Sequence, residues 1–150
     1  MASNLFKGRL RGGNGVKIML ETLADFIAKN FPRGKAVELG IGFQTKVALR
    51  LIQLGYDVLA IDWNEKAVEN ARKDGIKALR DDLFRPRLSL YRNAVVLYSV
   101  RPTPEIMKPI VELSRKTGVP LVILPLSGDS VPRPLRLVNY KGLAIYVYKP

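Results

Sequence analysis

The feature that most constrains the fold of this chain is a short apolar run that ends in two closely spaced glycines, Val37-Glu38-Leu39-Gly40-Ile41-Gly42. Residues 35–39 have the apolar character of a buried strand, and the residues after Gly42 begin a helix that extends to residue 54. Glycine adopts the backbone angles of a tight turn, and the amides at the start of a helix carry partial positive charge. The stretch therefore predicts a strand, a turn and a helix at which a nucleotide-sized ligand approaches the backbone.

Acidic residues flank this turn on both sides. Glu38 lies two residues before the first glycine, where a dinucleotide-binding turn carries an apolar residue because the pyrophosphate repels an acid. An acid at this position favours a cationic ligand. Asp62 ends the next predicted strand, residues 57–61, about twenty residues after the turn, where a carboxylate can accept both hydroxyls of a ribose. Trp63 follows directly and either covers one face of an adenine ring or is buried in the core.

The pattern Glu38-x-Gly40-x-Gly42, followed by Asp62 after the second strand and by an acid after the third, resembles the class I S-adenosylmethionine-dependent methyltransferases. The resemblance covers residues 35–124 and is closest to a small archaeal family of uncharacterised proteins with that fold. The later stretch Tyr98-Ser99-Val100-Arg101-Pro102 is also similar to that family. The resemblance implies S-adenosylmethionine as the cofactor, with its methionine amine near Glu38 and its ribose on Asp62.

An acid after the third predicted strand, residues 76–79, is expected near the adenine. In the methyltransferase pattern this acid hydrogen-bonds the exocyclic amine of adenine, and the apolar residue after it lines the ring. The resemblance therefore favours Asp82 followed by Leu83, with Asp81 as the alternative. Both acids could also do no more than end the strand.

The end of the fourth predicted strand, residues 93–100, supplies the substrate candidates Tyr98, Ser99, Arg101 and Pro102. Methyltransferases that act on exocyclic amines place an Asp or Asn followed by two prolines near this point. This chain has neither residue there, and Thr103 separates its prolines. The resemblance thus implies a cofactor site without the usual amine-methylating residues. Arg101 could hold a phosphate or the methionine carboxylate, although an arginine at a strand end is about as often a surface residue.

Composition excludes several kinds of site. The chain of 150 residues contains no cysteine and no histidine. It therefore lacks a thiol nucleophile, a disulfide framework and the commonest metal ligand, which makes metal catalysis and serine-histidine hydrolysis poor hypotheses. We find no apolar run of about eighteen residues and no signal-peptide pattern, so we expect a soluble cytoplasmic protein with no membrane segment and no bound metal.

The net charge of +12 is unevenly distributed along the chain. Residues 1–34 carry six basic and two acidic residues, residues 35–84 carry eight of each, and residues 85–150 carry eleven basic and three acidic residues. The half that would hold the cofactor is neutral and the flanking parts are basic, so we expect an anionic partner, with RNA as the preferred one. The alternative is that the basic residues only solvate a small protein. A protein partner or a homo-oligomer is left open.

The order of predicted elements indicates the fold class. Residues 1–15 are expected to form a flexible basic arm, and residues 16–150 a single domain that begins with an amphipathic helix over residues 16–31. Alternating strands and helices predict an α/β three-layer sandwich with a mostly parallel, doubly wound sheet. An antiparallel hairpin over residues 135–148 ends it. Asn64 is expected to cap the helix that Gly75 ends.

These observations leave three functions to compare. The first is a methyltransferase that uses S-adenosylmethionine and acts on RNA or another anionic substrate. The second is a non-catalytic module that binds RNA or a protein and retains the methyltransferase fold, which the unusual end of the fourth strand favours. The third, a nicotinamide-dependent oxidoreductase, is disfavoured by Glu38 and by Gln44-Thr45, where a third small residue would fall. Whether the chain is an enzyme is left open.

Overall fold

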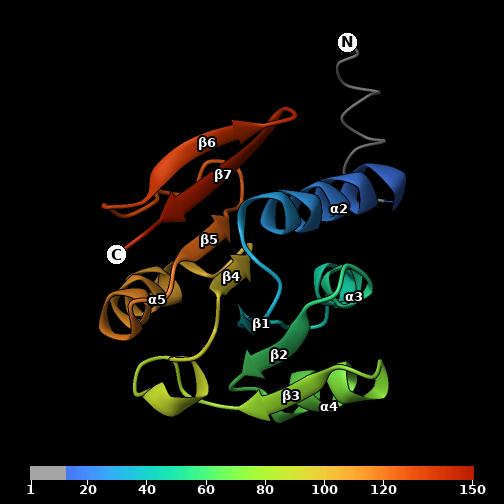
Figure 1. Ribbon diagram of the computed structural model, residues 1–150, viewed down its shortest axis with the longest axis vertical. Helices are drawn as coiled ribbons and strands as arrows, with labels where there is room; N and C mark the ends of the chain where they lie inside the picture. The colour runs from blue at the N-terminus through green and yellow to red at the C-terminus, as the bar shows by residue number, and fades with distance from the viewer. Residues whose placement is uncertain (1–12) are drawn as a thin grey trace.

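The computed structural model describes residues 13–150, and their strands form one seven-stranded sheet in the order β3-β2-β1-β4-β5-β7-β6 (Figure 1). Strand β7 runs antiparallel to both of its neighbours, and the pairs among β1 to β5 are parallel. The predicted α/β fold with a C-terminal hairpin is therefore confirmed. The elements in chain order are α2 (Gly13–Asn30), β1 (Lys35–Leu39), α3 (Lys46–Gln53), β2 (Asp57–Asp62), α4 (Glu65–Lys73), β3 (Lys77–Arg80), the 3₁₀ turn η1 (Leu88–Leu90), β4 (Val96–Val100), α5 (Pro104–Thr117), β5 (Leu121–Leu124), β6 (Arg136–Tyr140) and β7 (Leu143–Tyr148).

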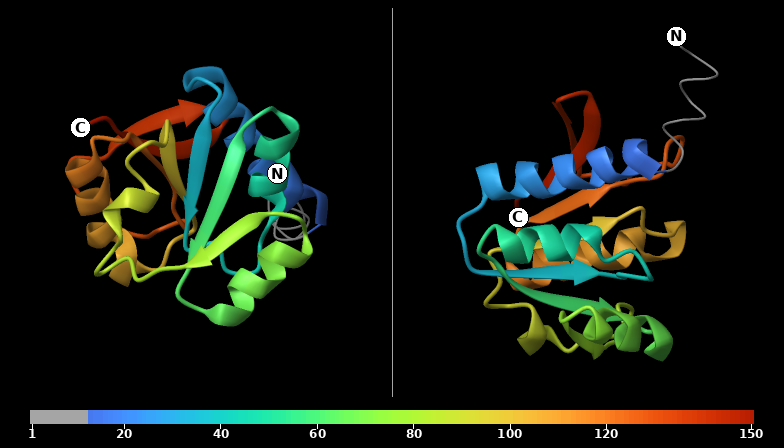
Figure 2. Two further views of the ribbon diagram at one scale, coloured as in Figure 1. Left: turned by 60° about the horizontal axis from the view of Figure 1, so that its bottom comes forward. Right: turned by 90° about the vertical axis from the view of Figure 1, so that its right-hand side faces the viewer.

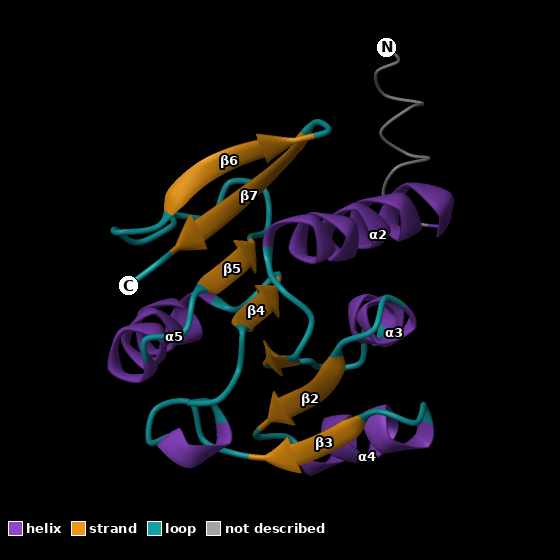
Figure 3. Cartoon of the chain, in the orientation of Figure 1, coloured by secondary structure: helices purple, strands orange, loops and turns teal. Residues whose placement is uncertain are grey.

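Helices cover both faces of the sheet, as Figure 3 shows. Helices α2, α3 and α4 pack on one face, and α5 with the turn η1 packs on the other. Alternate residues of each strand enter different cores: Ala36 of β1 joins the core beneath α2 and α3, whereas Val37 joins the core beneath α5. This alternation produces the three-layer sandwich. None of the helices in residues 13–150 combines the length and apolar character needed to cross a bilayer.

Helix α2 begins earlier than the sequence indicated. It spans Gly13–Asn30, so residues 13–15, which we assigned to the flexible arm, are helical, and residues 1–12 of that arm lie outside the described residues. Glycine is a poor helix former. The apolar face of α2, which includes Leu20 and Leu23, is fully buried against the sheet and α3. This packing stabilises the helix, and its two glycines are confined to the first turn.

The carboxyl ends of the parallel strands meet at one edge of the sheet (Figure 2). Strand β1 lies between β2 and β4, and the chain winds outward from this pair in opposite directions. Glu38 is in register with Ala60 of β2 and with Tyr98 of β4. The turn after β1 therefore lies at the topological switch point, where ligands of open α/β sheets bind.

Candidate functional site

A cleft of about 680 Å³ opens at this carboxyl edge, within the usual volume range of ligand pockets, about 300–1,000 Å³. The turn after β1, the ends of β2, β3 and β4, and the start of α5 form its walls. It brings together most of the predicted site residues: Gly40, Gly42, Asp62, Trp63, Asp82, Leu83, Arg101 and Pro102.

The glycine turn presents its backbone to the cleft. Gly40 and Gly42 have φ angles of 71° and 58°, in the left-handed region that favours glycine. A Cβ atom added at Gly42 would meet no atom within 4 Å, so the site requires glycine there for its backbone angle and leaves open space above the turn. The amides of Gly40 and Ile41 both donate to the carbonyl of Ile61, at 2.8 and 3.0 Å. The turn is thus held against the end of β2.

Asp62 is fixed by backbone amides on both of its oxygens. Its Oδ2 accepts from the amide of Gly42 at 2.8 Å, and its Oδ1 accepts from the amide of Asn64 at 2.8 Å. The side chain is half-buried and lines the cleft. Because each carboxylate oxygen can accept more than one hydrogen bond, both oxygens keep capacity for a ligand donor.

Polar groups at the start of α3 form hydrogen bonds within the protein. The amide of Lys46, the first helical residue, donates to Oε1 of Gln44 at 3.1 Å. Thr45 does not cap the helix with its side chain; its hydroxyl donates to Oδ2 of Asp74 at 2.6 Å. The first amide of the helix is therefore already bound by a side chain of the turn.

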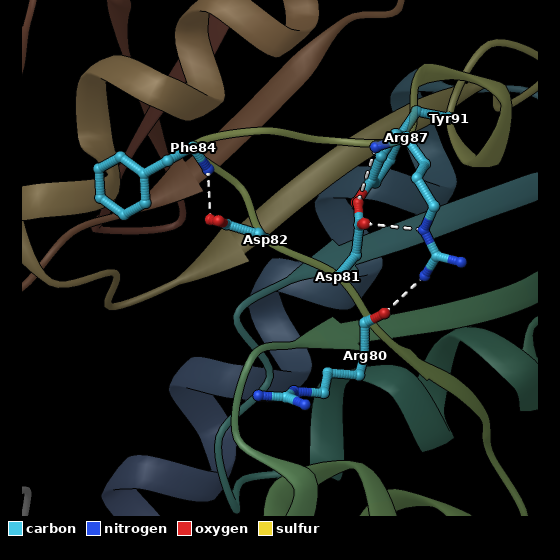
Figure 4. A network of polar contacts seen from close by, with 6 residues as sticks. All are labelled: Arg80, Asp81, Asp82, Phe84, Arg87 and Tyr91. Carbon is cyan, nitrogen blue, oxygen red and sulfur yellow. Dashed lines mark hydrogen bonds and ion pairs between the residues drawn. The ribbon is translucent and has the colours of Figure 1, made fainter.

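The two acids after β3 have different roles, which Figure 4 shows. Asp81 is buried, and its carboxylate accepts from the backbone and guanidinium of Arg87 and from the hydroxyl of Tyr91. Arg87 also donates to the carbonyl of Arg80. Burial raises the pKa of Tyr91, and its hydrogen bond to Asp81 raises it further. Asp81 thus stabilises the loop between β3 and β4 through hydrogen bonds to two of its residues, Arg87 and Tyr91.

Asp82 lines the cleft, and its carboxylate accepts fewer hydrogen bonds than that of Asp81. Its Oδ1 accepts from the amide of Phe84 at 2.9 Å, and its Oδ2 has no hydrogen-bond partner among residues 13–150. The neighbouring Leu83 is buried and joins the core beneath α5 while lining the cleft. Of the two acids, Asp82 is the one with an oxygen available to a ligand.

Trp63 is exposed at the cleft, with 58% of its surface accessible, so the alternative of a buried tryptophan is wrong. The guanidinium of Arg80 lies over its ring at 3.8 Å from the centroid, and Arg80 Nε donates to the Trp63 carbonyl at 2.8 Å. Such stacking holds a tryptophan ring in place. One ring face is covered by Arg80.

Glu38 does not line the cleft, contrary to the position we expected for it. It is 1% exposed, and neither its carboxylate nor the facing hydroxyl of Tyr98 has a hydrogen bond of good geometry within residues 13–150. Burial raises the pKa of Glu38 to about 8; the nearby Tyr98 hydroxyl lowers it and the charge of Asp62 raises it, both to a smaller extent. Glu38 is therefore mainly protonated at neutral pH, because taking a carboxylate out of water disfavours its charged form.

The substrate candidates at the end of β4 divide into two pairs. Tyr98 and Ser99 are buried and do not reach the cleft; the hydroxyl of Ser99 donates to the carbonyl of Leu39 at 2.7 Å. Arg101 and Pro102 do line the cleft. Arg101 has a φ angle of 50°, rare for a residue with a side chain. The structure therefore leaves Arg101 and Pro102 as the residues of this group that a ligand can touch.

The cleft residues that the sequence interpretation missed include two phenylalanines. Phe43 lies in the glycine turn and Phe84 in the loop after β3, and both line the cleft with exposed side chains. A large apolar residue inside a turn, or two positions after a pair of acids, was the available sign, because loop positions normally carry polar residues.

A second cavity, of about 520 Å³, lies between α2 and the β6–β7 hairpin. Its lining includes the aromatic Phe26 and Phe31 and the basic Arg136 and Lys149. It contains none of the predicted site residues and lies beside the amino-terminal end of β6.

Comparison with known proteins places the chain in a family. The model of the Uncharacterised protein family (UPF0146) matches residues 19–150. A UPF0146 protein of Pyrococcus horikoshii is 50% identical over 128 residues, which are 85% of this chain and 98% of that protein. Among solved structures, an RNA methyltransferase from Salinibacter ruber in complex with S-adenosyl-L-homocysteine matches with a TM-score of 0.61 and 20% identity, over 92% of each chain.

A TehB-like S-adenosylmethionine-dependent methyltransferase from Corynebacterium glutamicum matches with a TM-score of 0.63 and 19% identity, over 84% of each chain. At these identities the likeness concerns the fold. The resemblance inferred from the glycine turn and the acids after the strands is thereby confirmed. The chain belongs to the archaeal family UPF0146 and has the Rossmann-like fold of the class I S-adenosylmethionine-dependent methyltransferases.

Proposed function

We propose that this chain binds S-adenosylmethionine in the cleft at the carboxyl edge of the sheet and transfers its methyl group to RNA. The observation that supports this most is the convergence of Gly42, Asp62 and Asp82, each from a different strand end, on one cleft. The same fold carries S-adenosyl-L-homocysteine in the Salinibacter ruber enzyme.

The residues of the cleft fit the adenosine part of this cofactor. Asp62 is held by two amides yet keeps acceptor capacity for the two ribose hydroxyls. Oδ2 of Asp82 is available for the exocyclic amine of adenine, and the uncovered face of Trp63 for its ring. The fit does not extend to Glu38, which is buried outside the cleft and mainly protonated at neutral pH.

The turn also favours a cofactor without phosphates. The amides of Gly40, Ile41 and Gly42 already donate to β2, and Gln44 covers the first amide of α3. A pyrophosphate needs such amides free. The nicotinamide-dependent alternative is therefore disfavoured by the hydrogen bonds of the turn as well as by its sequence.

Methyl transfer makes modest chemical demands on this chain. When bound, S-adenosylmethionine supplies a methyl group that is electrophilic because it is attached to a sulfonium. An acceptor nitrogen would take this methyl group as the S–C bond breaks; the electron pair of that bond would stay on sulfur, and the proton lost from nitrogen would pass to water. The task of the cleft residues is to hold the reactants in line, and proximity and alignment supply most of the rate.

RNA is proposed as the acceptor because the second half of the chain is basic. Of the eleven basic residues between positions 85 and 150, Arg87 and Arg115 form ion pairs within the described residues. The remaining positive charges have no carboxylate partner in residues 13–150 and can neutralise phosphates.

A non-catalytic RNA-binding module is the second candidate. It is favoured by the end of β4, where Tyr98 and Ser99 are buried at the position from which amine methyltransferases present their acceptor-binding residues. Such a module would bind RNA with steep salt dependence and transfer no methyl group.

Two measurements separate these candidates. Calorimetric titration with S-adenosylmethionine and S-adenosyl-L-homocysteine, with NAD as the comparison, tests the cofactor; micromolar binding of the first two alone is expected. Trp63 is the only tryptophan of the chain, so its fluorescence reports binding at the cleft independently. Transfer of tritium from the labelled methyl group to bulk RNA then tests catalysis. Cofactor binding without transfer would favour the module, and binding of NAD alone would refute the proposal.

A further inference from the structure

The cleft gathers the strongly exposed aromatic rings of the described residues 13–150. Among residues 13–150, the aromatic residues with strongly exposed side chains are Phe43 at 62%, Trp63 at 58% and Phe84 at 61%, and all of them line the cleft. Other rings, such as those of Phe26 and Tyr91, are buried in the cores. Exposed apolar surface of this kind, concentrated at one cleft, marks a binding site.

The proposed cofactor accounts for only one of these rings. Trp63 is covered by Arg80 on one face, and adenine would occupy the other face. Phe43 comes from the turn after β1 and Phe84 from the loop after β3, and neither is needed for the contacts assigned to Asp62 and Asp82. Two exposed phenylalanines therefore remain for a second, flat, apolar group.

The backbone of Phe84 is held in position. Its amide donates to Asp82, so the loop is ordered at this point, and Figure 4 shows its ring projecting away from the network of Asp81, Arg87 and Tyr91. Phe84 borders both the cleft and a small cavity of about 110 Å³ against α5. Its ring therefore stands at the wall between the cleft and α5.

Arg101 adds a cation to the same cleft. Its side chain is half-buried and lines the cleft, and it forms no ion pair or hydrogen bond with residues 13–150. Its backbone amide donates to the carbonyl of Leu124 at 2.6 Å while φ is 50°, so β5 holds this arginine in a strained conformation. A half-buried guanidinium that lines a cleft and lacks a carboxylate partner is suited to a phosphate.

We propose that Phe43, Phe84 and Arg101 form a subsite for one unpaired nucleobase of single-stranded RNA, with the base stacked on the phenylalanine rings and an adjoining phosphate on the guanidinium. This inference rests on the proposed function and specifies its acceptor: the methylated nitrogen belongs to a base that is not paired. Stacking on aromatic side chains is how proteins hold bases of single strands. The basic residues without carboxylate partners in the second half of the chain favour RNA over an uncharged aromatic molecule.

The test compares two RNA probes that differ in their bases alone. Both are fluorescein-labelled single strands of about ten nucleotides; one is intact and the other has abasic sugars at its central positions. Binding is followed by fluorescence anisotropy with saturating S-adenosyl-L-homocysteine. The stacking energy of one base corresponds to about 5- to 150-fold in affinity, so the wild-type protein should bind the intact strand tighter by that factor.

The double variant Phe43→Ala/Phe84→Ala should bind both probes with the affinity that the wild-type protein has for the abasic strand. The matched control is Ile52→Ala/Leu126→Ala, which removes two exposed apolar side chains outside the cleft and should leave base discrimination unchanged. The fold of each variant is checked by circular dichroism. Arg101→Gln should weaken the binding of both probes by a similar factor, because they share their phosphates.

Several outcomes would overturn the subsite: no binding of either probe by the wild-type protein, equal binding of both, or a double variant that still discriminates between them. Failure of the proposed function is seen separately. If S-adenosyl-L-homocysteine neither changes Trp63 fluorescence nor releases heat while base discrimination persists, the cofactor proposal fails and the base subsite stands. If the cofactor binds and discrimination is absent, the subsite fails and the cofactor proposal stands.

Discussion

The backbone amide of Gly42 donates to Oδ2 of Asp62 at 2.8 Å. This hydrogen bond joins the turn after β1 to the end of β2, so one carboxylate both shapes the turn and faces the cleft. A ligand that donates hydroxyl groups to Asp62 would meet an acceptor already fixed in position.

Replacing Asp62 with alanine should weaken the binding of S-adenosyl-L-homocysteine by about 1–3 kcal/mol, because ribose hydroxyls would lose their acceptor and the turn its anchor. The control is Asp57→Ala, at the opposite end of the same strand, where the carboxylate is exposed and pairs with Lys77. Calorimetric titration measures both variants. An affinity unchanged in Asp62→Ala would remove this residue from the cofactor site.

Glu38→Gln should change how stability depends on pH. The pKa of Glu38 is raised from 4.5 to about 8 by burial, so the folded protein retains a proton that the unfolded chain releases between these values. Wild-type stability should therefore fall as pH rises from 5 to 8, by about 1.4 kcal/mol for each pH unit and up to about 4 kcal/mol in all. Glutamine cannot titrate, so the variant should not show this fall.

Urea unfolding of both proteins at pH 5 and pH 8 measures this difference. Glu112→Gln, which removes a partly exposed carboxylate paired with Arg115, serves as the control and should follow the wild-type protein. Parallel stability curves for wild type and Glu38→Gln would show that Glu38 is ionised in the folded state.

Tyr91→Phe should destabilise the protein by about 1–3 kcal/mol, because the buried Oδ2 of Asp81 would lose one of its two donors and keep only the amide of Arg87. Tyr140→Phe is the comparison: its ring packs against Phe26 and its hydroxyl makes no hydrogen bond within the described part of the chain. The free energy of unfolding in urea measures both. If the two variants lost the same free energy of unfolding, the Tyr91 hydroxyl would not stabilise the loop.

Arg101 and Lys141 share a φ angle of 50° in different settings, one at the cleft and one in the β6–β7 turn. Asparagine tolerates this conformation better, so Arg101→Asn and Lys141→Asn should each stabilise the protein by up to about 1 kcal/mol. Arg101→Asn should also weaken RNA binding, whereas Lys141→Asn should change it far less. Thermal unfolding and fluorescence anisotropy measure the two effects. Equal losses of RNA binding would indicate that Arg101 contributes only its charge.

Local signals in the sequence predicted local structure well. Asn64 caps α4 as expected, with its Oδ1 accepting from the amide of Lys66 at 2.9 Å, and the glycine turn adopts the left-handed angles that only glycine adopts easily. The short stretch with Pro86 between β3 and β4 contains one 3₁₀ turn in place of a full crossover helix. Each of these features depends on residues that are close in the sequence.

Features that depend on distant residues were not predictable in the same way. Glu38 is buried because it faces Tyr98, sixty positions later in the sequence, across paired strands. Asp81 accepts more hydrogen bonds than Asp82, because the loop brings the side chains of Arg87 and Tyr91 into hydrogen-bond contact with Asp81. No rule of sequence spacing predicts this contact. A single sequence shows that acids are present after a strand, but their partners are decided by tertiary packing.

Arg80 connects three segments at the edge of the sheet. Its guanidinium lies on the ring of Trp63 and donates to the carbonyl of that residue, and its own carbonyl accepts from Arg87. This wall of the cleft is therefore ordered before a ligand arrives, and binding avoids the entropy loss of about 0.5–1.5 kcal/mol for each side chain that it would otherwise immobilise. The heat capacity change on binding should accordingly reflect the apolar area that the ligand covers, without the larger contribution of a folding loop.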